Sequence, residues 1–300
     1  MRLLVTADIH YNHPTSRAAA DDLIERMNRA GGDGVLLVGD TAAADGDALE
    51  TCLSRFDLPA NAPRLFVAGN HELWTRGSDS HEIFTTALPG RVTRAGWRWL
   101  ETDPFVARSF AIVGTIGWYD YSFAPADLGI PRRFYENKVS PGAAAHLSDY
   151  RHLLDDAEDV PPHARDVTAR WNDAKFVTLH RPDEAFLDEL LARLRSHLSS
   201  LAAGHRDLGT IVAATHHLPF RQLLPPLRIP QWDFAQAFLG SEKIGNLLLE
   251  FPQVTQCFCG HSHFAAEATI PRGDDVPPIT AVNIGSGYRA KTFRAVDFPD

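Results

Sequence analysis

Five short groups of metal-binding residue types recur along the chain, each after an apolar stretch. The groups are Asp8-Ile9-His10, Gly39-Asp40, Gly69-Asn70-His71-Glu72, Thr215-His216-His217 and Gly260-His261-Ser262-His263. The apolar stretches are typical of short buried strands, so the polar groups are expected where strands end and loops begin. Enzymes commonly carry functional side chains in such loops. Together the groups contain enough ligands for two metal ions, provided that the fold brings these strand ends together.

Strands and helices are predicted to alternate along most of the chain. Strands are expected at Arg2 to Ala7, Gly34 to Val38, Leu65 to Ala68, Phe110 to Thr115, Thr210 to Ala214 and Val254 to Cys259. Helices are expected at Ser16 to Ala30, Asp183 to Leu201 and Ser241 to Phe251. A terminal pair of antiparallel strands is expected at Ala265 to Ile270 and Ile279 to Ile284. Alternating strands and helices indicate a layered α/β fold.

The length and composition favour one domain, residues 1–300, because 300 residues with 44% hydrophobic content can form a sizeable core. The regular pattern breaks after Gly117, and a segment rich in prolines, charges and aromatic residues continues from about Trp118 to Leu179. We interpret this segment as an insertion that could cover the site as a lid and govern substrate specificity.

The charge and the cysteines bear on partners and compartment. A net charge of -9 gives no general attraction to nucleic acid or anionic lipid. Three cysteines and no recognisable signal segment favour a reducing cytoplasm, and no apolar run reaches the roughly 18 residues that a membrane span requires. Cys257 and Cys259 alternate with Gln256 and Phe258. This spacing favours one face of a strand over a zinc–thiolate site.

The five groups have a coherent chemistry. Carboxylate, imidazole and amide oxygen suit manganese, iron or zinc, whereas calcium prefers oxygen ligands almost alone. Asp8 and His10 can face one side of an extended segment, and Asp40 can bridge two cations through its two oxygens. His261 and His263 could each serve one metal. Two cations about 3.5–4 Å apart would hold a phosphoryl group and generate hydroxide at neutral pH.

In order and spacing the groups resemble the calcineurin-like metallophosphoesterase superfamily from residue 1 to about residue 287. The matching motifs are DxH, GD, GNH(E/D), a histidine after a buried strand, GHxH, and an NxGS piece at Asn283 to Ser286. The resemblance implies a four-layer αββα sandwich of two mixed β-sheets. Protein serine/threonine phosphatases of this superfamily carry arginine before GNHE, where this chain has Ala68. A close relationship to those enzymes is therefore not expected.

The resemblance also implies two metal sites and a catalytic pair. Site one would consist of Asp8, His10, Asp40 and His263, and site two of Asp40, Asn70, His216 and His261. Both would hold divalent ions, with manganese favoured over iron and zinc. Besides the bridging Asp40, the resemblance makes His71 catalytic, as the acid beside the leaving group. Glu72 is expected to orient a ligand rather than to be one.

Several assignments stay open at this level. The strand position favours His216 as the ligand, whereas the spacing to Pro219 favours His217. Candidate substrate contacts are His217, Tyr119 and His13. Arg132 and Arg133 could be surface charges or phosphate contacts.

The sequence therefore indicates a metal-dependent phosphoesterase that hydrolyses a phosphate mono- or diester by attack of metal-bridged hydroxide. A small phosphoester or nucleotide is the expected partner. A nuclease or a nucleotide or cyclic-nucleotide hydrolase on the same scaffold is an alternative, although the acidic balance does not favour nucleic acid. A non-catalytic scaffold protein is less favoured, because such a protein would be expected to lack some of the ligands. The pattern does not indicate an oligomeric state.

Overall fold

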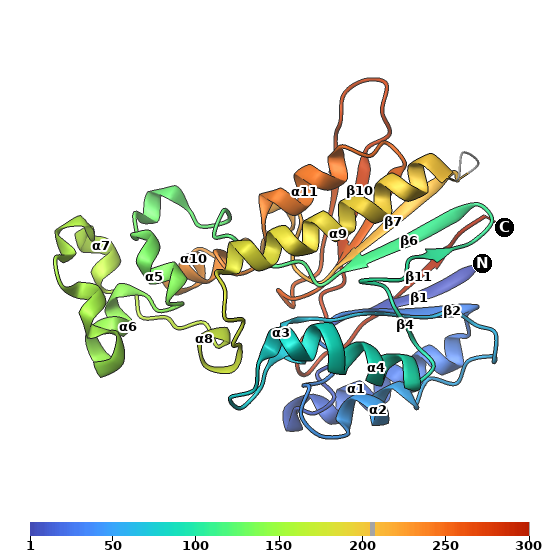
Figure 1. The fold of residues 1–300 in the computed structure, drawn as a ribbon, viewed down its shortest axis with the longest axis horizontal. Helices are drawn as coiled ribbons and strands as arrows, with labels where there is room; N and C mark the ends of the chain where they lie inside the picture. Colours follow the sequence, from blue (N-terminus) through green and yellow to red (C-terminus); the bar gives the residue numbers. More distant parts are fainter. Residues whose placement is uncertain (205–207, 300) are drawn as a thin grey trace.

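Two β-sheets pack face to face and helices cover both outer faces (Figure 1). The computed structural model describes residues 1–204 and 208–299. The order of layers is helix, sheet, sheet, helix, which confirms the predicted αββα sandwich of two mixed sheets. Both chain termini lie at the end of the sandwich that faces away from the segment carrying α5 to α7 (Figure 1).

The first sheet has the strand order β11-β1-β2-β3-β4. Its strands are β1 (Arg2–Thr6), β2 (Gly34–Val38), β3 (Arg64–Val67), β4 (Arg98–Trp99) and β11 (Arg294–Asp297). The first four are parallel, and β11 pairs antiparallel with β1. The two edge strands were not predicted, because β4 has only two residues and β11 is largely exposed and polar.

The second sheet has the strand order β5-β6-β7-β8-β10-β9. Its strands are β5 (Phe105–Val106), β6 (Phe110–Thr115), β7 (Thr210–Thr215), β8 (Val254–Cys259), β9 (Ala266–Ile270) and β10 (Ile279–Asn283). The four central strands are parallel and the two edge strands antiparallel. The predicted β9–β10 pair is confirmed, but it does not end the chain, because β11 crosses back to the first sheet.

The core between the sheets follows from the period of two along each strand. Leu3 and Val5 of β1 pack in the same buried cluster as Ile112 of β6 and Val212 of β7. The alternate residues, such as Leu4, face the outer helices instead. Because the central parallel strands are covered on both faces, they appear in the sequence as continuous apolar runs rather than as alternating ones.

Helices on the first sheet are α1 (Pro14–Ala30), α2 (Ala48–Leu53), α3 (Ser80–Glu82) and α4 (Leu88–Arg94). The buried residues of α1 include Ala20, Leu23, Ile24 and Met27, at the spacing of one helical face. The helix begins two residues before the predicted start, because proline is favourable in the first turn and the His13 side chain accepts a hydrogen bond from the Thr15 N–H at 3.3 Å.

Helices α9 (Asp183–Gly204) and α11 (Glu242–Leu249) cover the second sheet. Leucines of α9 at 190, 194, 198 and 201 are buried, at helical spacing. Cys257 and Cys259 face this helical layer and Phe258 faces the other sheet, which agrees with the predicted strand alternation. All three cysteines, Cys52 included, are buried and free. Among the residues that the structure describes, none of the helices is both long and apolar enough to span a membrane.

The segment interpreted as an insertion consists of short helices and turns, and Figure 1 shows it extending from one end of the sandwich. Its helices are α5 (Arg132–Glu136), α6 (Pro141–His146), α7 (Pro162–Arg165) and α8 (Asp173–Phe176), and α10 (Pro230–Gln236) lies against it. Its first residues, Trp118 and Tyr119, are fully buried, and Trp118 packs edge-on against Phe186 of α9 at 5.3 Å. The beginning of the segment is thus part of the main core.

Candidate metal centre

The loops after the parallel strands of both sheets meet at one edge of the sandwich. The Asp8 N–H after β1 donates to the Gly39 carbonyl after β2 at 3.0 Å, and the His10 N–H donates to the Asp40 carbonyl at 2.8 Å. In the second sheet, the Gly260 N–H after β8 donates to the His216 carbonyl after β7 at 3.1 Å. Backbone hydrogen bonds therefore lock neighbouring loops together where the predicted ligands lie.

The backbone is strained at most of the predicted ligands. The residues with left-handed φ are Asp8 (54°), His10 (47°), Asp40 (54°), His261 (70°) and His263 (57°). This conformation costs about 1–3 kcal/mol for a residue other than glycine and persists only where the surroundings enforce it. Such strain is typical of functional sites, because it directs side chains that a relaxed loop would splay apart.

Two of the motif glycines are required by close approach. A Cβ atom on Gly69 would lie 2.2 Å from Oδ1 of Asp40, and one on Gly39, whose φ is 86°, would lie 2.2 Å from Nδ1 of His216. No other residue type fits at these contacts. The glycines before Asp40 and Asn70 thus allow three loops to converge.

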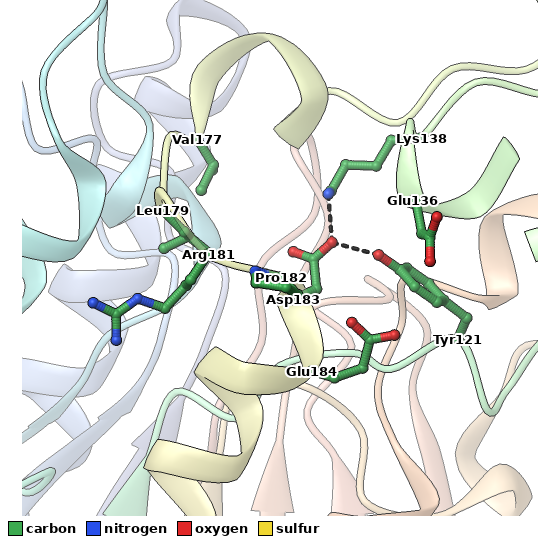
Figure 2. A pocket seen from close by; sticks show the side chains of 9 residues that line it. All are labelled: Tyr121, Glu136, Lys138, Val177, Leu179, Arg181, Pro182, Asp183 and Glu184. Carbon is green, nitrogen blue, oxygen red and sulfur yellow. Dashed lines mark hydrogen bonds and ion pairs between the residues drawn. The ribbon is translucent and has the colours of Figure 1, made fainter. Parts of the chain in front are cut away.

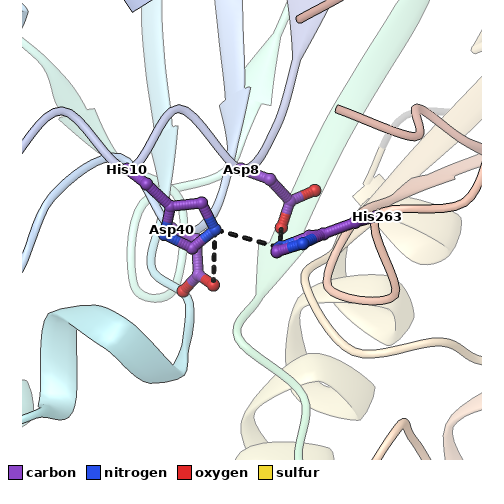
Figure 3. Close-up of side chains that lie close together, drawn as sticks. All are labelled: Asp8, His10, Asp40 and His263. Carbon is purple, nitrogen blue, oxygen red and sulfur yellow. Dashed lines mark hydrogen bonds and ion pairs between the residues drawn. The ribbon is translucent and has the colours of Figure 1, made fainter. Parts of the chain in front are cut away.

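Asp8, His10, Asp40 and His263 form one cluster, whose potential ligand atoms all lie within 4.8 Å of one another (Figure 3). Nε2 of His10 lies 3.0 Å from Nε2 of His263 and 3.7 Å from Oδ2 of Asp40. Nε2 of His263 lies 3.6 Å from Oδ1 of Asp8. These are the four residues predicted for site one.

Asp40, His216 and His261 form a second cluster that shares Asp40 with the first. Nε2 of His216 lies 3.4 Å from Oδ1 of Asp40, 3.1 Å from Nδ1 of His261 and 3.3 Å from Oδ1 of Asn70. Asp40 therefore directs one carboxylate oxygen toward His10 and the other toward His216. A carboxylate in this position can bridge two cations.

Backbone carbonyls orient the imidazoles of the second cluster. The ring nitrogen Nδ1 of His216 lies 3.1 Å from the Val38 carbonyl, and Nε2 of His261 lies 3.2 Å from the Phe238 carbonyl. A neutral imidazole that donates to a carbonyl has its lone pair on the other nitrogen. In both histidines that other nitrogen faces the cluster.

The donor set fits divalent cations. Oδ2 of Asp8 is buried without a hydrogen-bond partner, which is costly in the absence of a ligand. The 3.0 Å between the nitrogens of His10 and His263 suits two ligands of one ion, since imidazole binds such metals at about 2.0–2.1 Å. Mixed carboxylate, imidazole and amide ligands agree with manganese, iron or zinc.

Burial sets the protonation of the cluster. It lowers the pKa of His10 and of His261 well below the usual range and also lowers the pKa of His263, so these rings are neutral and able to bind a metal. Burial alone would raise the pKa of Asp40, but the charges of His216 and His71 hold it well below its ordinary value. Burial likewise opposes the ionised form of His216, yet the Asp40 carboxylate raises the pKa of His216 to about 9.

His71 lies beside the clusters rather than within them. Its ring stacks on Trp74 with centroids 3.6 Å apart, and its Nε2 lies 3.8 Å from Oδ2 of Asp40. Its backbone N–H donates to Oδ1 of Asp40 at 2.9 Å. The side chain reaches the cavity described below, where it can meet a substrate.

Glu72 forms hydrogen bonds with the backbone of the loop that carries Asp40. Its carboxylate accepts backbone N–H groups of Asp40 (3.0 Å), Thr41 (2.6 Å), Ala42 (2.9 Å) and Gly69 (2.6 Å). Both oxygens are occupied by these donors. This arrangement agrees with the expectation that Glu72 orients a ligand rather than binding a metal itself.

A cavity of about 280 Å³ opens over the two clusters. His71, His261 and His263 line the side of the cavity that faces the two clusters. Its other walls carry the aromatic residues Trp74, Trp171, Trp232 and Tyr288, together with Arg170. The insertion and α10 thus contribute directly to the cavity wall. None of these aromatic residues was predicted from the sequence as a substrate contact. The available signal was the position of Trp74 and Tyr288, each two residues after a motif, GNHE and NxGS respectively.

The three predicted substrate contacts do not line this cavity. Tyr119 and His217 are fully buried behind the ligands, where the Tyr119 hydroxyl donates to Asp173 at 3.1 Å and Nδ1 of His217 lies 3.0 Å from the Ile116 carbonyl. His13 is exposed, with its ring 4.7 Å from Tyr288. Of the two adjacent histidines, His216 is the one in the ligand cluster.

The two arginines left open by the sequence also lie apart from the cavity. Arg133 forms an ion pair with Asp159 at 2.6 Å, and Arg132 pairs with Glu136 at 2.8 Å. Both pairs lie within the insertion. They agree with the interpretation of these arginines as surface charges.

A second cavity, of about 420 Å³, lies between the insertion and the start of α9 (Figure 2). At its wall, Asp183 accepts hydrogen bonds from the Tyr121 hydroxyl at 2.5 Å and from Lys138 at 2.6 Å (Figure 2). Asp183 also accepts one from the Trp118 indole at 2.8 Å. These charged and polar groups satisfy one another. The contacts join the insertion to α9, and the cavity contains none of the predicted ligands.

Comparison with known proteins agrees with this geometry. The sequence profile described as calcineurin-like phosphoesterase matches residues 1–265. The chain therefore belongs to the calcineurin-like phosphoesterase family, which supports a metal-dependent hydrolase of phosphoesters. No curated protein sequence matches the chain.

Two solved structures are similar to the chain. The structure of phosphopantetheinyl hydrolase from Mycobacterium tuberculosis is 19% identical, with a TM-score of 0.65 over 96% of this chain and 89% of that one. A dimetal phosphatase from Danio rerio is 14% identical, with a TM-score of 0.49 over 98% of this chain and 91% of that one. The likeness to the first structure, at 19% identity, shows that the two proteins share a fold.

The shared carboxylate predicts the behaviour of Asp40→Asn. We expect this variant to lose both metals and all measurable phosphoesterase activity, because an amide offers one neutral oxygen where two charged oxygens are needed. Metal content of the purified protein, measured after reconstitution with Mn²⁺, checks the prediction. Asp8→Asn is the control and should affect mainly site one. Loss of a single metal from Asp40→Asn, with activity retained, would contradict the shared ligand.

The adjacent histidines predict a contrast between two alanine variants. His216→Ala removes a side chain from the ligand cluster and should weaken metal binding by about 10-fold or more, by analogy with the cost of disturbing the partners of metal ligands. His217→Ala should retain metal affinity, because its ring hydrogen-bonds the Ile116 carbonyl instead. Mn²⁺ titration of both variants measures the difference. Equal losses in both would mean that the loop as a whole, rather than His216, holds the ion.

Proposed function

We propose that the protein is a phosphoesterase that uses two divalent metal ions to hydrolyse a phosphate mono- or diester. The position of Asp40 carries the proposal, because its two oxygens face two separate groups of potential ligands. Site one would be held by Asp8, His10 and His263, and site two by Asn70, His216 and His261, with Asp40 common to both. When bound, such cations activate water as a nucleophile and neutralise charge on the phosphoryl group.

His71 is proposed to donate a proton to the leaving oxygen. It lies on the cavity wall and outside both ligand clusters, so its ring is available to the substrate. Its stack on Trp74 and its backbone hydrogen bond to Asp40 fix its position relative to the bridging carboxylate. A positioned general acid of this kind typically contributes about 10²–10⁴-fold to the rate.

The cavity walls favour a substrate with a planar group. Trp74, Trp171, Trp232 and Tyr288 offer ring faces, and Arg170 offers a positive charge. Aromatic rings stack on nucleobases, with about 1–3 kcal/mol per base. A nucleotide or cyclic-nucleotide hydrolase is therefore the second candidate function that the structure supports. Nuclease activity has less support, because the net charge is -9.

The native metal and the compartment are part of the same proposal. The mixed oxygen and nitrogen ligands suit manganese, with iron and zinc as alternatives. Three free, buried cysteines agree with a reducing cytoplasm.

A substrate screen with Mn²⁺ tests the proposal. We expect hydrolysis of at least one class among simple monoesters, simple diesters, mononucleotides and cyclic nucleotides, and loss of that activity when a chelator removes the metal. A preference for the nucleotides would identify the aromatic walls as the specificity element. A protein that binds two metals and hydrolyses none of these esters would favour the non-catalytic scaffold instead.

The role of His71 predicts a dependence on the leaving group. His71→Asn should slow hydrolysis of an alkyl or nucleoside ester far more than that of a nitrophenyl ester, because nitrophenolate can depart without a proton. Rates of the variant and the wild type on both ester types measure this difference, and metal content should not change. Equal rate losses would instead assign His71 to charge stabilisation or substrate positioning. Loss of metal would make His71 a ligand.

A further inference from the structure

Asp173 is a buried carboxylate that connects the insertion with the candidate metal centre. It is the first residue of α8 and only 1% exposed. Four side chains donate hydrogen bonds to it, and all four donors are uncharged: Asn70, Trp74, Tyr119 and Trp171. We propose that Asp173 is a positioning residue, which fixes Asn70 as a ligand of site two and fixes Trp74 as the support of His71. This inference rests on the metal sites of the proposed function.

The hydrogen bond to Asn70 determines which end of its amide faces the metal site. Nδ2 of Asn70 donates to Oδ1 of Asp173 at 2.9 Å. An ionised carboxylate can only accept hydrogen bonds, so the amide NH₂ must point to Asp173. The amide oxygen is thereby directed to the other side, where it lies 3.3 Å from Nε2 of His216. Only this orientation presents an oxygen ligand to the second cluster.

The same oxygen of Asp173 holds Trp74. The Trp74 indole N–H donates to Oδ1 of Asp173 at 2.7 Å. One face of the indole stacks on His71 at 3.6 Å between centroids, and the indole also stacks on Phe176 of α8 at 4.8 Å. Asp173 therefore fixes the ring plane on which the proposed proton donor rests.

The second oxygen ties both ends of the insertion to this point. The Tyr119 hydroxyl donates to Oδ2 of Asp173 at 3.1 Å, and the Trp171 indole N–H donates to it at 2.8 Å. Tyr119 is close to the start of the insertion and Trp171 close to its end. The insertion thus orients ligands in addition to covering the cavity. This role also accounts for the burial of Tyr119 away from the substrate.

Asp173→Asn tests the inference with almost no change in shape. An amide at this position would direct an NH₂ group at donors that need an acceptor, so Asn70 or its neighbours must lose a hydrogen bond. We expect the affinity of site two for Mn²⁺ to fall by about 10–100-fold, the typical cost of disturbing a partner of a metal ligand, while site one stays within a few fold of wild type. Mn²⁺ titration followed by EPR measures this, because a coupled ion pair and a single ion give different spectra.

Asp183→Asn is the matched control. Asp183 is also a buried carboxylate of this region, and it accepts from Trp118, Tyr121 and Lys138 without contacting a candidate ligand. Its replacement should lower stability and leave both metal affinities unchanged. Equal loss of metal from the Asp173 and Asp183 variants would mean that Asp173 affects metal binding only through the stability of the fold. That result would overturn the inference.

The double variant Asn70→Asp/Asp173→Asn exchanges donor and acceptor across one hydrogen bond. It should recover site-two affinity relative to Asp173→Asn, because an oxygen again faces the cluster while the bond is restored. If the double variant did not recover this affinity, the inference would be overturned. The same holds if Asp173→Asn bound two metal ions as well as the wild type does. Either result would leave the proposed function intact. Absence of metal from the wild-type protein would overturn the proposed function itself, so the two failures are distinguishable.

Discussion

The convergence of strand-end loops on the Asp40 carboxylate is the constraint on which the rest of this structure depends. Two groups of ligands can share one residue only if loops from both sheets approach within hydrogen-bond distance of it. The glycines at 39 and 69 permit this approach, since a Cβ atom at either position would overlap His216 or Asp40. The left-handed backbone of the ligands has the same origin, because it directs side chains from separate strands to one point.

The strain at the centre is balanced by contacts around it. Glu72 binds four backbone N–H groups of the converging loops, and the Lys291 ammonium donates to the Asp8 carbonyl. Asn283, from the NxGS piece, donates to the Ser262 hydroxyl at 2.7 Å and so holds the loop that carries His261 and His263. None of these residues is placed as a metal ligand. Their role is to keep the ligand atoms close together when electrostatics and backbone preference would separate them.

The insertion contributes both to the cavity and to the surroundings of the candidate ligands. Arg170, Trp171 and Asn172 of this segment line the cavity, whereas Tyr119 and Asp173 are buried next to the candidate ligands. One segment therefore contacts both the cavity and the residues around the candidate metal centre. Such coupling would make substrate preference and metal affinity depend on the same structural element.

The sequence by itself determined the layered α/β fold, the positions of the central strands and the set of ligand candidates, because buried strands and the motifs after them are local patterns. It left His216 and His217 as alternatives, since adjacent residues share one strand end, and only the structure shows that the ring of His216 lies in the ligand cluster while Nδ1 of His217 meets the Ile116 carbonyl. The edge strand β11 and the buried role of Asp173 were decided only by tertiary structure. Asp173 lies 103 residues from Asn70 in an irregular segment, where no periodicity indicates which donors will surround a side chain. Long-range contacts of this kind arise from packing, which local sequence does not encode.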